Sequence, residues 1–272
     1  MKSKYITNLT VPPKSSFTIK NVDPSDTLDL NDKDQARKEL ETIHEQMAEL
    51  QEKLYAQGRY AVLVIFQAMD TGGKDGTIRH VFGPLNPQGV RVVNFKAPCG
   101  TELEHDYLWR IHKEVPRKGM IGIFNRSHYE DVLIARVHNL VPDEEIEKRY
   151  AQINAFEKYL TENHVLIIKF LLHISKNEQK NRLEKRLERP DKQWKFDKSD
   201  LEERKHWDDY MQAFERVLNE CSTSHAPWHV IPANHKWARD LMVGNITLEH
   251  MKSLNSSYPE PPSGLDNISI PD

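Results

Sequence analysis

One segment of the chain has the residue types and spacing of a loop that holds phosphate: it reads AMDTGGKDGT from Ala68 to Thr77. It nearly fits the pattern G-x-x-x-x-G-K-[ST], with alanine for the first glycine and Asp75 for the last hydroxyl residue. Two consecutive glycines let the backbone wrap around an anion, so that N–H groups and the following helix N-terminus point at phosphate oxygens. Lys74 adds a positive charge. Asp70 or Thr77 can supply the magnesium-binding oxygen that the missing hydroxyl would have given.

A second candidate site follows a short apolar run at residues 120–124, where the sequence continues NRSHYED. In enzymes with a phosphate loop, a carboxylate near the end of such a strand helps to hold magnesium. Asp70 and Asp131 are therefore the expected pair of oxygen ligands for one or two hard cations, Mg²⁺ or Mn²⁺. Arg126 is expected to contact a phosphate through both arms of its guanidinium. The alternative is that Glu130 and Asp131 only begin a helix and favour its dipole.

A basic stretch lies at residues 176–198, which read KNEQKNRLEKRLERPDKQWKFDK. Residues 169–198 hold ten basic and five acidic residues, a local charge of +5. Such a run is often just a solvated helix face. In P-loop kinases, however, an arginine-bearing lid closes over the phosphates from this part of the fold, excludes water and stabilises the transferring group. We therefore expect a helical lid at about residues 182–200.

Apolar runs and helical periodicity predict the elements that carry these motifs. Strands are expected at Tyr60–Ala68, Val90–Phe95, Met120–Phe124, Val165–Ile174 and Trp228–Pro232. Helices are expected along a Leu40–Leu54 stripe ending at Gly58, from Thr101 with a capping box to Glu104, and at Asp143–Glu162, Lys176–Glu188, Ser199–Cys221 and Trp237–Leu254. The alternation predicts an α/β fold in three layers, with a central parallel sheet of about five strands and helices on both faces.

The same reading divides the chain into three parts. Residues 1–30, with three prolines, are expected to be an irregular arm, residues 31–254 a single domain, and residues 255–272 a loosely ordered tail. The stripe at residues 40–54 is expected to pack on the domain's own sheet, with self-association of that helix as the alternative.

Composition limits the classes of partner. The chain has 272 residues with a formal net charge of −3, which argues against a surface that is basic all over, as nucleic-acid binding would need. No apolar run is long enough to cross a bilayer, and the N-terminus lacks the apolar stretch of a secretory signal. Two cysteines, Cys99 and Cys221, fit free thiols in a reducing compartment. We therefore expect a cytoplasmic protein without nucleic-acid or membrane partners.

Together these motifs resemble the polyphosphate kinase 2 family. The matching segments are QAMDTGGKDGTIRHVFGPLNPQGVRVVNFKAP, HDYLWRIHKEVPRKGMIGIFNRSHYEDVLIARVH and NRLEKRLERPDKQWKF, within a likeness that covers most of Leu40 to Leu254. Aspartate before Gly-Gly-Lys-Asp-Gly is the family's own variant of the phosphate loop. The glutamate at position 130 is similar to the residue found at this place in class III, the subclass that phosphorylates both nucleoside monophosphates and diphosphates.

The resemblance implies a P-loop kinase-like fold and a polyphosphate:nucleotide phosphotransferase. Inorganic polyphosphate would donate its terminal phosphoryl group to AMP or ADP, giving ADP or ATP, with magnesium as cofactor and guanine nucleotides as further acceptors. The reverse reaction is expected in such a family, as is a homo-oligomer, either dimer or tetramer. The competing hypotheses are a nucleoside or nucleotide kinase that uses ATP as donor, and a non-catalytic phosphate-binding regulator.

The resemblance also assigns roles to residues. The expected catalytic residues are Asp70, Lys74, Arg126, Asp131 and Arg182, of which Asp70 and Asp131 would hold the metal. The expected phosphate- or nucleotide-binding residues are Thr71, Gly72, Gly73, Asp75, Gly76, Thr77, Glu130, Arg186, Arg189, Lys192 and Lys195. Within these sets Arg126, Arg182 and Arg186 are the expected phosphate clamps, and Lys192 and Lys195 are expected to face phosphate from the lid.

Overall fold

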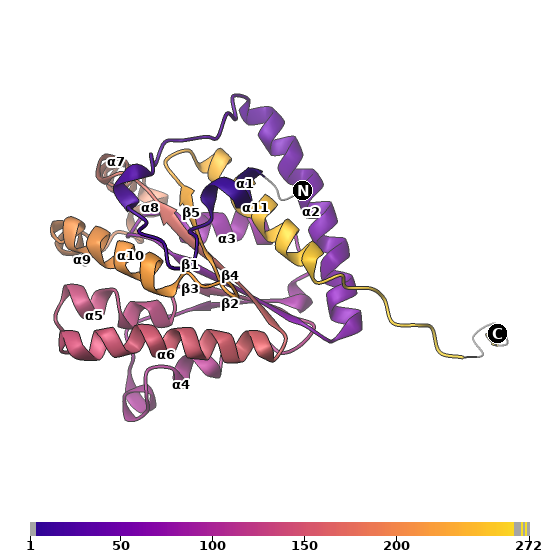
Figure 1. Ribbon diagram of the computed structural model, residues 1–272. Helices are drawn as coiled ribbons and strands as arrows, with labels where there is room; N and C mark the ends of the chain where they lie inside the picture. The colour runs from indigo at the N-terminus through magenta and orange to yellow at the C-terminus, as the bar shows by residue number, and fades with distance from the viewer. Residues whose placement is uncertain (1–3, 264–267, 269, 271–272) are drawn as a thin grey trace.

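A five-stranded parallel sheet forms the centre of the computed structural model, which describes residues 4–263, 268 and 270 (Figure 1). The strand order is β2-β3-β1-β4-β5. The strands are β1 (Ala61–Gln67), β2 (Val90–Asn94), β3 (Ile121–Asn125), β4 (Val165–His173) and β5 (Trp228–Pro232). Every predicted strand is confirmed to within one residue at each end. The expected parallel sheet is confirmed as well, because all four neighbouring pairs run parallel.

The position of β1 between β3 and β4 decides where the motifs meet. Ile65 of β1 lies opposite Phe124 of β3 on one side and Lys169 of β4 on the other. The carboxyl ends of parallel strands share one edge of the sheet, where α/β proteins bind their ligands. The phosphate loop after β1, the acidic segment after β3 and the basic helix after β4 are therefore brought to the same edge.

Helices cover both faces of the sheet (Figure 1). One group packs together on one face: α1 (Lys4–Leu9), α2 (Lys33–Gln57), α3 (Lys74–Phe82) and α11 (Lys236–Ser253). The other face holds α4 (Trp109–His112), α5 (Ile134–Val137), α6 (Asp143–Glu162) and α10 (Trp207–Cys221). The basic segment forms α7 (Lys176–Glu188), α8 (Pro190–Gln193) and α9 (Ser199–Lys205). Four short 3-10 helices complete the elements: η1 (Ile19–Asn21), η2 (Pro87–Gly89), η3 (Gly100–Glu104) and η4 (His128–Asp131).

The long helix α2 shows how local sequence and packing combine. It begins after Asp32, whose carboxylate accepts from the amides of Asp34 and Gln35, and it ends at Gly58 in the left-handed conformation. We expected this helix to pack on the sheet. Instead it packs mainly against α11, which itself contacts β4 and β5. Gly244 allows this, because a Cβ there would lie 2.9 Å from the side chain of Leu40.

Two predicted helices differ from the structure. The segment at Thr101 is only the 3-10 helix η3. Its N-cap is Cys99, whose backbone amide donates to the carboxylate of Glu102 at 3.2 Å. The capping pair therefore starts two residues earlier than predicted. The single helix expected over residues 199–221 is two helices separated at His206. The break divides a helix without buried residues, α9, from the amphipathic α10, whose apolar face lies in the core.

The arm is more ordered than its composition predicts. It contains α1 and η1, and it docks along β5 and α10. The amide of Val11 donates to the carbonyl of Trp228 at 2.9 Å, and the hydroxyl of Ser222 donates to the carbonyl of Val11 at 2.6 Å. The carboxylate of Glu215 accepts from the amide of Ile19 at 2.9 Å. The expectation of an irregular arm is therefore wrong for residues 4–9 and 19–21, which are helical, while residues 11–18 have no regular secondary structure.

The tail has no regular secondary structure over residues 255–262 and is mostly exposed there. Part of the predicted tail, residues 264–267, 269 and 271–272, lies outside the described residues, as do residues 1–3 of the arm. Within the described part of the chain, no helix has the length and apolar character needed to span a membrane.

Candidate active site

The phosphate loop joins β1 to α3 in a tight turn. Thr71 and Gly73 both have left-handed backbones, with φ of 60° and 106°, and Gly73 is the N-cap of α3. The amide and the hydroxyl of Thr77 both bond the carbonyl of Gly73, at 2.9 and 3.1 Å, which fixes the first helical turn. Lys74 is buried, and its ammonium donates to the carbonyl of Ala68 at 2.9 Å. This is the strand–loop–helix context that the sequence motif requires.

Four charged groups gather beside this loop. The guanidinium of Arg126 donates to the carboxylate of Asp70 at 2.7 Å. Burial raises the pKa of Glu130, and nearby Arg126 and Lys74 oppose that rise. Burial lowers the pKa of Lys74, and the positive charge of Arg126 lowers it further. The charges of these four side chains therefore influence one another: Asp70, Lys74, Arg126 and Glu130. Negative and positive groups alternate among them, an arrangement that suits the binding of phosphates.

The backbone of Arg126 helps to aim its side chain. This residue directly follows β3, and its φ of 64° is uncommon for a residue with a side chain. Its amide still bonds the carbonyl of Phe66 on β1, at 3.1 Å, so the turn is tied to the neighbouring strand. Such strained residues concentrate at functional sites, where the surrounding structure holds them in place.

Asp131 lies in a different environment from Asp70. Its carboxylate is 3.7 Å from the guanidinium of Arg149 on α6, which also donates to the Asp131 carbonyl at 2.8 Å. Burial raises the pKa of Asp131 to about 6, against the opposing effect of Arg149. The charged groups that act on Asp131 are Arg149, Glu130 and Arg110, whereas Asp70 acts on Glu130. The carboxyl of Asp131 is thus influenced mainly by Arg149, whereas that of Glu130 interacts with the charges of Arg126, Lys74 and Asp70.

Arg182 supports the loop from α7. Its Nε donates to Glu178 at 2.7 Å. Its Nη1 donates to the carbonyls of Thr71 and Gly72, at 3.0 and 3.1 Å. Its Nη2 donates to the carbonyls of Ala233 and Asn234, at 2.6 and 3.2 Å. All five N–H donors of this buried guanidinium are used by the protein. Direct binding of phosphate by Arg182 stays a prediction; what the structure shows is that this guanidinium bonds the carbonyl side of the loop.

A second buried arginine, Arg239 of α11, lies against the same loop and was not found from the sequence. Its Nε and Nη2 donate to Asp240, at 2.8 and 2.6 Å, and Asp240 also bonds His80 of α3 at 2.8 Å. A Cβ on Gly73 would lie 2.2 Å from its Nη1. This contact shows why a glycine is needed at the N-cap of α3. No motif in the helix sequence marks this arginine as a loop neighbour.

The lid segment reaches the loop through Lys195. Its ammonium lies 3.2 Å from the carboxylate of Asp75 at the start of α3. The side-chain Nδ2 of Asn125 also donates to the carboxylate of Asp75, at 2.8 Å, and to the side-chain oxygen of Asn94, at 2.7 Å. Burial acts to raise the pKa of Asp75, but the bonds from Asn125 and Lys195 outweigh it and the pKa is lowered. Asp75 therefore joins β3 to the lid, and Asn125 extends this network to β2.

Three other basic side chains of the lid also have acidic neighbours. Arg186 donates to Asp200 at 3.1 Å, and Arg189 and Lys192 lie 2.9 and 3.5 Å from Asp191. Asp200 of α9 was not found from the sequence, where it is one acid among many. Burial and the negative charge of Asp70 raise its pKa to about 6, so it belongs to the electrostatic surroundings of the site.

Comparison with known proteins identifies this arrangement. The sequence model described as Polyphosphate kinase 2 (PPK2) matches residues 30–259. The chain belongs to the polyphosphate kinase 2 family. The resemblance seen in the phosphate loop, the acidic segment and the lid is therefore confirmed.

Individual relatives agree with the family. A protein of Meiothermus ruber named AMP/ADP-polyphosphate phosphotransferase is 50% identical over 261 residues, which cover 96% of this chain and 98% of that protein. A protein of Rhodopseudomonas palustris named ADP-polyphosphate phosphotransferase is 49% identical over 233 residues, 81% of each chain. The crystal structure of polyphosphate kinase 2 from Arthrobacter aurescens TC1 superposes with a TM-score of 0.94 at 44% identity, covering 97% of this chain and 95% of that one. The expected P-loop kinase-like fold is confirmed.

The side-chain oxygens near the phosphate loop could hold a hard cation only if bound phosphates supplied further ligands. Among the described residues, no three side chains of the His, Cys, Asp and Glu types are grouped to hold a metal ion. Magnesium in such families needs only one or two carboxylates, because phosphates and water fill the other positions. The carboxylates of Asp70, Glu130 and Asp131 are the candidates for that role, with Asp70 beside Arg126 and Asp131 beside Arg149.

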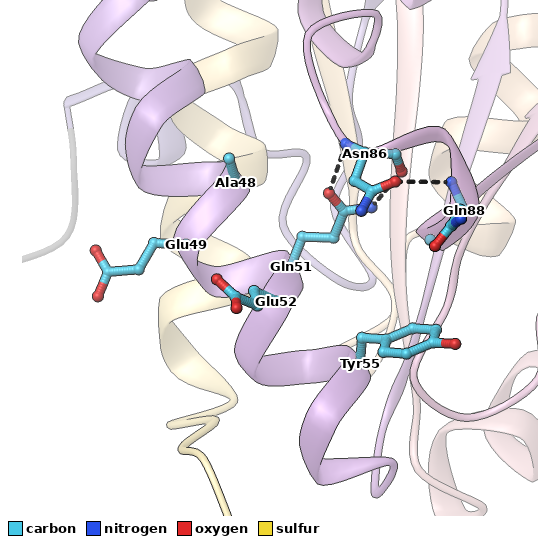
Figure 2. A pocket seen from close by; sticks show the side chains of 8 residues that line it. Ala48, Glu49, Gln51, Glu52, Tyr55, Asn86 and Gln88 are labelled. Carbon is cyan, nitrogen blue, oxygen red and sulfur yellow. Dashed lines mark hydrogen bonds between the residues drawn. The ribbon is translucent and has the colours of Figure 1, made fainter. Parts of the chain in front are cut away.

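A cavity of about 510 Å³ lies elsewhere, between α2 and η2 (Figure 2). Gln51 closes its floor by bonding the backbone of Asn86 on both sides, at 2.8 and 3.0 Å. Glu49, Glu52 and Tyr55 line it, and none of the described residues that line it is basic. The acidic lining disfavours the binding of phosphate. This cavity is therefore not part of the candidate active site at the phosphate loop.

Proposed function

We propose that the chain transfers the terminal phosphoryl group of inorganic polyphosphate to both AMP and ADP, with magnesium at the reaction centre. The family makes the chain a polyphosphate-dependent nucleotide kinase, with polyphosphate and adenine nucleotides as its substrates. The observation that carries the proposal for both acceptors is the likeness to the Meiothermus ruber protein, which spans nearly the whole of both chains and whose name includes both.

The chain's own groups can perform this reaction. Phosphoryl transfer needs in-line positioning and charge neutralisation more than covalent catalysis. The loop amides and Lys74 would hold phosphate oxygens, and Arg126 would exchange part of its contact with Asp70 for a phosphate. Magnesium, when bound, would neutralise phosphate charge, with Asp70 and Glu130 as its first carboxylates and Asp131 as the alternative. Arg182 would act on the reaction through the loop that it supports.

The segment at residues 182–200 is proposed as the lid. Its cations are now paired with acids on or near the surface: Arg189 and Lys192 with Asp191, and Lys195 with Asp75. Exposed pairs of this kind contribute only about 0–1 kcal/mol, so a polyphosphate chain can replace the acidic partners at little cost. Binding of the polyanion through these cations would weaken as salt increases.

Finer features of the proposal stay predictions. They are acceptance of guanine nucleotides, the reverse reaction, assembly into a dimer or tetramer, and a cytoplasmic location.

The decisive experiment supplies AMP or ADP with magnesium and polyphosphate but without ATP, and follows the formation of ADP and ATP by chromatography. We expect both acceptors to be phosphorylated, and no product when polyphosphate is omitted or when Asp70→Asn replaces the wild type. Product that appears only with ATP as donor would instead indicate an ordinary nucleotide kinase. Binding of polyphosphate without turnover would indicate a regulator.

A further inference from the structure

Lys169 places a fully buried positive charge in the middle of β4. The residues around it in the strand are apolar, and its side chain has no exposed surface. Its ammonium donates three hydrogen bonds: to Glu157 at 2.6 Å, to the hydroxyl of Tyr129 at 2.8 Å, and to the carbonyl of Cys221 at 2.8 Å. An ammonium has three donors, so its bonding capacity is filled. One side chain thus joins β4 to α6, η4 and the end of α10.

Glu157 of α6 completes the buried pair and holds η4. Its carboxylate is also without exposed surface, and it accepts from the hydroxyl of Tyr129 at 2.7 Å and from His128 at 3.4 Å. Tyr129 packs its ring edge-on against Trp228, with the ring centres 4.8 Å apart. A buried ion pair adds little to stability compared with an apolar pair of similar size. What this pair provides beyond stability is a fixed position for the tyrosine hydroxyl.

A second contact from α6 holds the other end of η4. Arg149, which precedes Glu157 by two helical turns, donates to the carbonyl of Asp131 at 2.8 Å. Glu130 lies between these two fixed points in η4, and the charges of Lys74 and Arg126 act on its carboxyl. A shift of Tyr129 would therefore move the carboxyl of Glu130 relative to the phosphate loop.

We propose that Lys169 and Glu157 are positioning residues, which set the place of the Glu130 carboxylate through the hydroxyl of Tyr129. They act through η4 and contact neither substrate. The inference rests on the proposed participation of Glu130 in phosphoryl transfer.

The test uses Tyr129→Phe, which removes the hydroxyl but keeps the ring against Trp228. Its control is Ile153→Val, which trims a buried apolar side chain of α6 and leaves the hydrogen bonds of η4 in place. We expect Tyr129→Phe to lower kcat about tenfold, with KM for polyphosphate within about twofold of wild type. Ile153→Val should keep kcat within about twofold at a comparable melting temperature.

A double variant, Lys169→Met with Glu157→Gln, should lower kcat in the same way while it remains folded. Equal losses of kcat in Tyr129→Phe and its control would overturn the proposal.

A double-mutant cycle then tests the route through Glu130. In a Glu130→Gln background, measured by single turnover, the effect of Tyr129→Phe should shrink from about tenfold to below about twofold. If turnover of Glu130→Gln is too slow to follow, the same cycle is run on the Kd for ADP. Effects that simply multiply would overturn the proposal. Full activity of Glu130→Gln on its own would instead refute the proposed role of Glu130, which separates the two failures.

Discussion

The Nη1 atom of Arg182 donates a hydrogen bond to the carbonyl oxygen of Thr71, 3.0 Å away. The bond connects the first turns of the basic helix α7 to the phosphate loop. A loop whose N–H groups point at phosphate turns its carbonyl oxygens outward, and those oxygens need donors of their own. Arg182 supplies donors to two of them, so the lid segment and the loop share one hydrogen-bonded unit.

Removing this support should affect catalysis strongly. We expect Arg182→Ala to lower kcat/KM by about 10², because it leaves buried carbonyls in the loop and at residues 233–234 without their donors. Arg182→Lys should not restore activity, because a single ammonium cannot reach the five partners of the guanidinium. Arg216→Ala serves as the control, since Arg216 of α10 forms ion pairs with Glu147 and Glu220. Steady-state kinetics at two temperatures checks the result, and an unchanged rate for Arg182→Ala would remove it from the site.

Gly73 should not tolerate a side chain. A Cβ there would meet Arg239 at 2.2 Å on a backbone with φ of 106°. Gly58 makes a matched control, because its φ is 59° and a Cβ would have nothing within 4 Å. We expect Gly58→Ala to cost about 1 kcal/mol of unfolding free energy with normal turnover. Gly73→Ala should lose nearly all turnover, measured with the polyphosphate assay. Equal behaviour of the two variants would mean that the contact with Arg239 is unimportant.

The three carboxylates should differ in their effect. We expect Asp70→Asn to abolish turnover while the circular dichroism spectrum and melting curve stay native. Glu130→Gln should lower kcat more than Asp131→Asn, since Glu130 acts on Lys74 and Arg126 whereas Asp131 pairs with Arg149. Titration of magnesium into metal-free protein should restore turnover and show a weaker apparent affinity in Glu130→Gln. The opposite ranking would return the metal to the pair Asp70 and Asp131 predicted from sequence.

His173, at the end of β4, should make folding sensitive to mild acid. Burial lowers its pKa from 6.5 to about 4. Below pH 6.5 the unfolded chain binds a proton that the folded chain does not bind until about pH 4, so stability falls as pH falls through this range. The loss is at most about 3 kcal/mol at pH 4. Urea denaturation at pH 7 and pH 4.5 should show a smaller drop for His173→Gln than for wild type. An identical drop would assign the effect to other groups.

The lid cation Lys195 should matter for polyphosphate and not for the fold. We expect Lys195→Gln to raise KM for polyphosphate several-fold, and to reduce the dependence of that KM on salt, because one phosphate contact is lost. Thermal stability should stay within about 1 kcal/mol, as for other half-exposed ion pairs. Asp75→Asn is the companion variant, which frees Lys195 without removing its charge. A KM unchanged by Lys195→Gln would exclude this lysine from the donor site.

Much of the framework was predictable from sequence for local reasons. The apolar runs predicted all five strands. Four of them are buried on both faces and carry little else, whereas the edge strand β2 is partly exposed and was recognisable from its three valines. The bounds of α6 and α7 matched as well, the first from its three acidic residues at the start and the second from Pro190 after its end. The phosphate loop was recognisable since its glycines and lysine are required by geometry.

Side-chain direction was the part that the sequence did not supply. Arg182 was placed among phosphate clamps because its neighbours are basic, yet it lies on the buried face of α7. Glu130 and Asp131 are adjacent in a 3-10 turn and point into different surroundings, which no spacing rule distinguishes. One signal was present and unused: Lys169 interrupts an apolar run, and a lysine buried in a strand needs a partner.

The docked arm has a consequence for the order of events during synthesis. Val11 and Ile19 leave the ribosome early, but the groups that bond their backbones, Trp228 and Glu215, are made some 200 residues later. Until then the arm has no place to dock, so its final contacts close the molecule after both the sheet and α10 exist. Docking of the arm would thus be the last step in the folding of this domain. Protection of residues 4–21 from protease would therefore report when folding is complete.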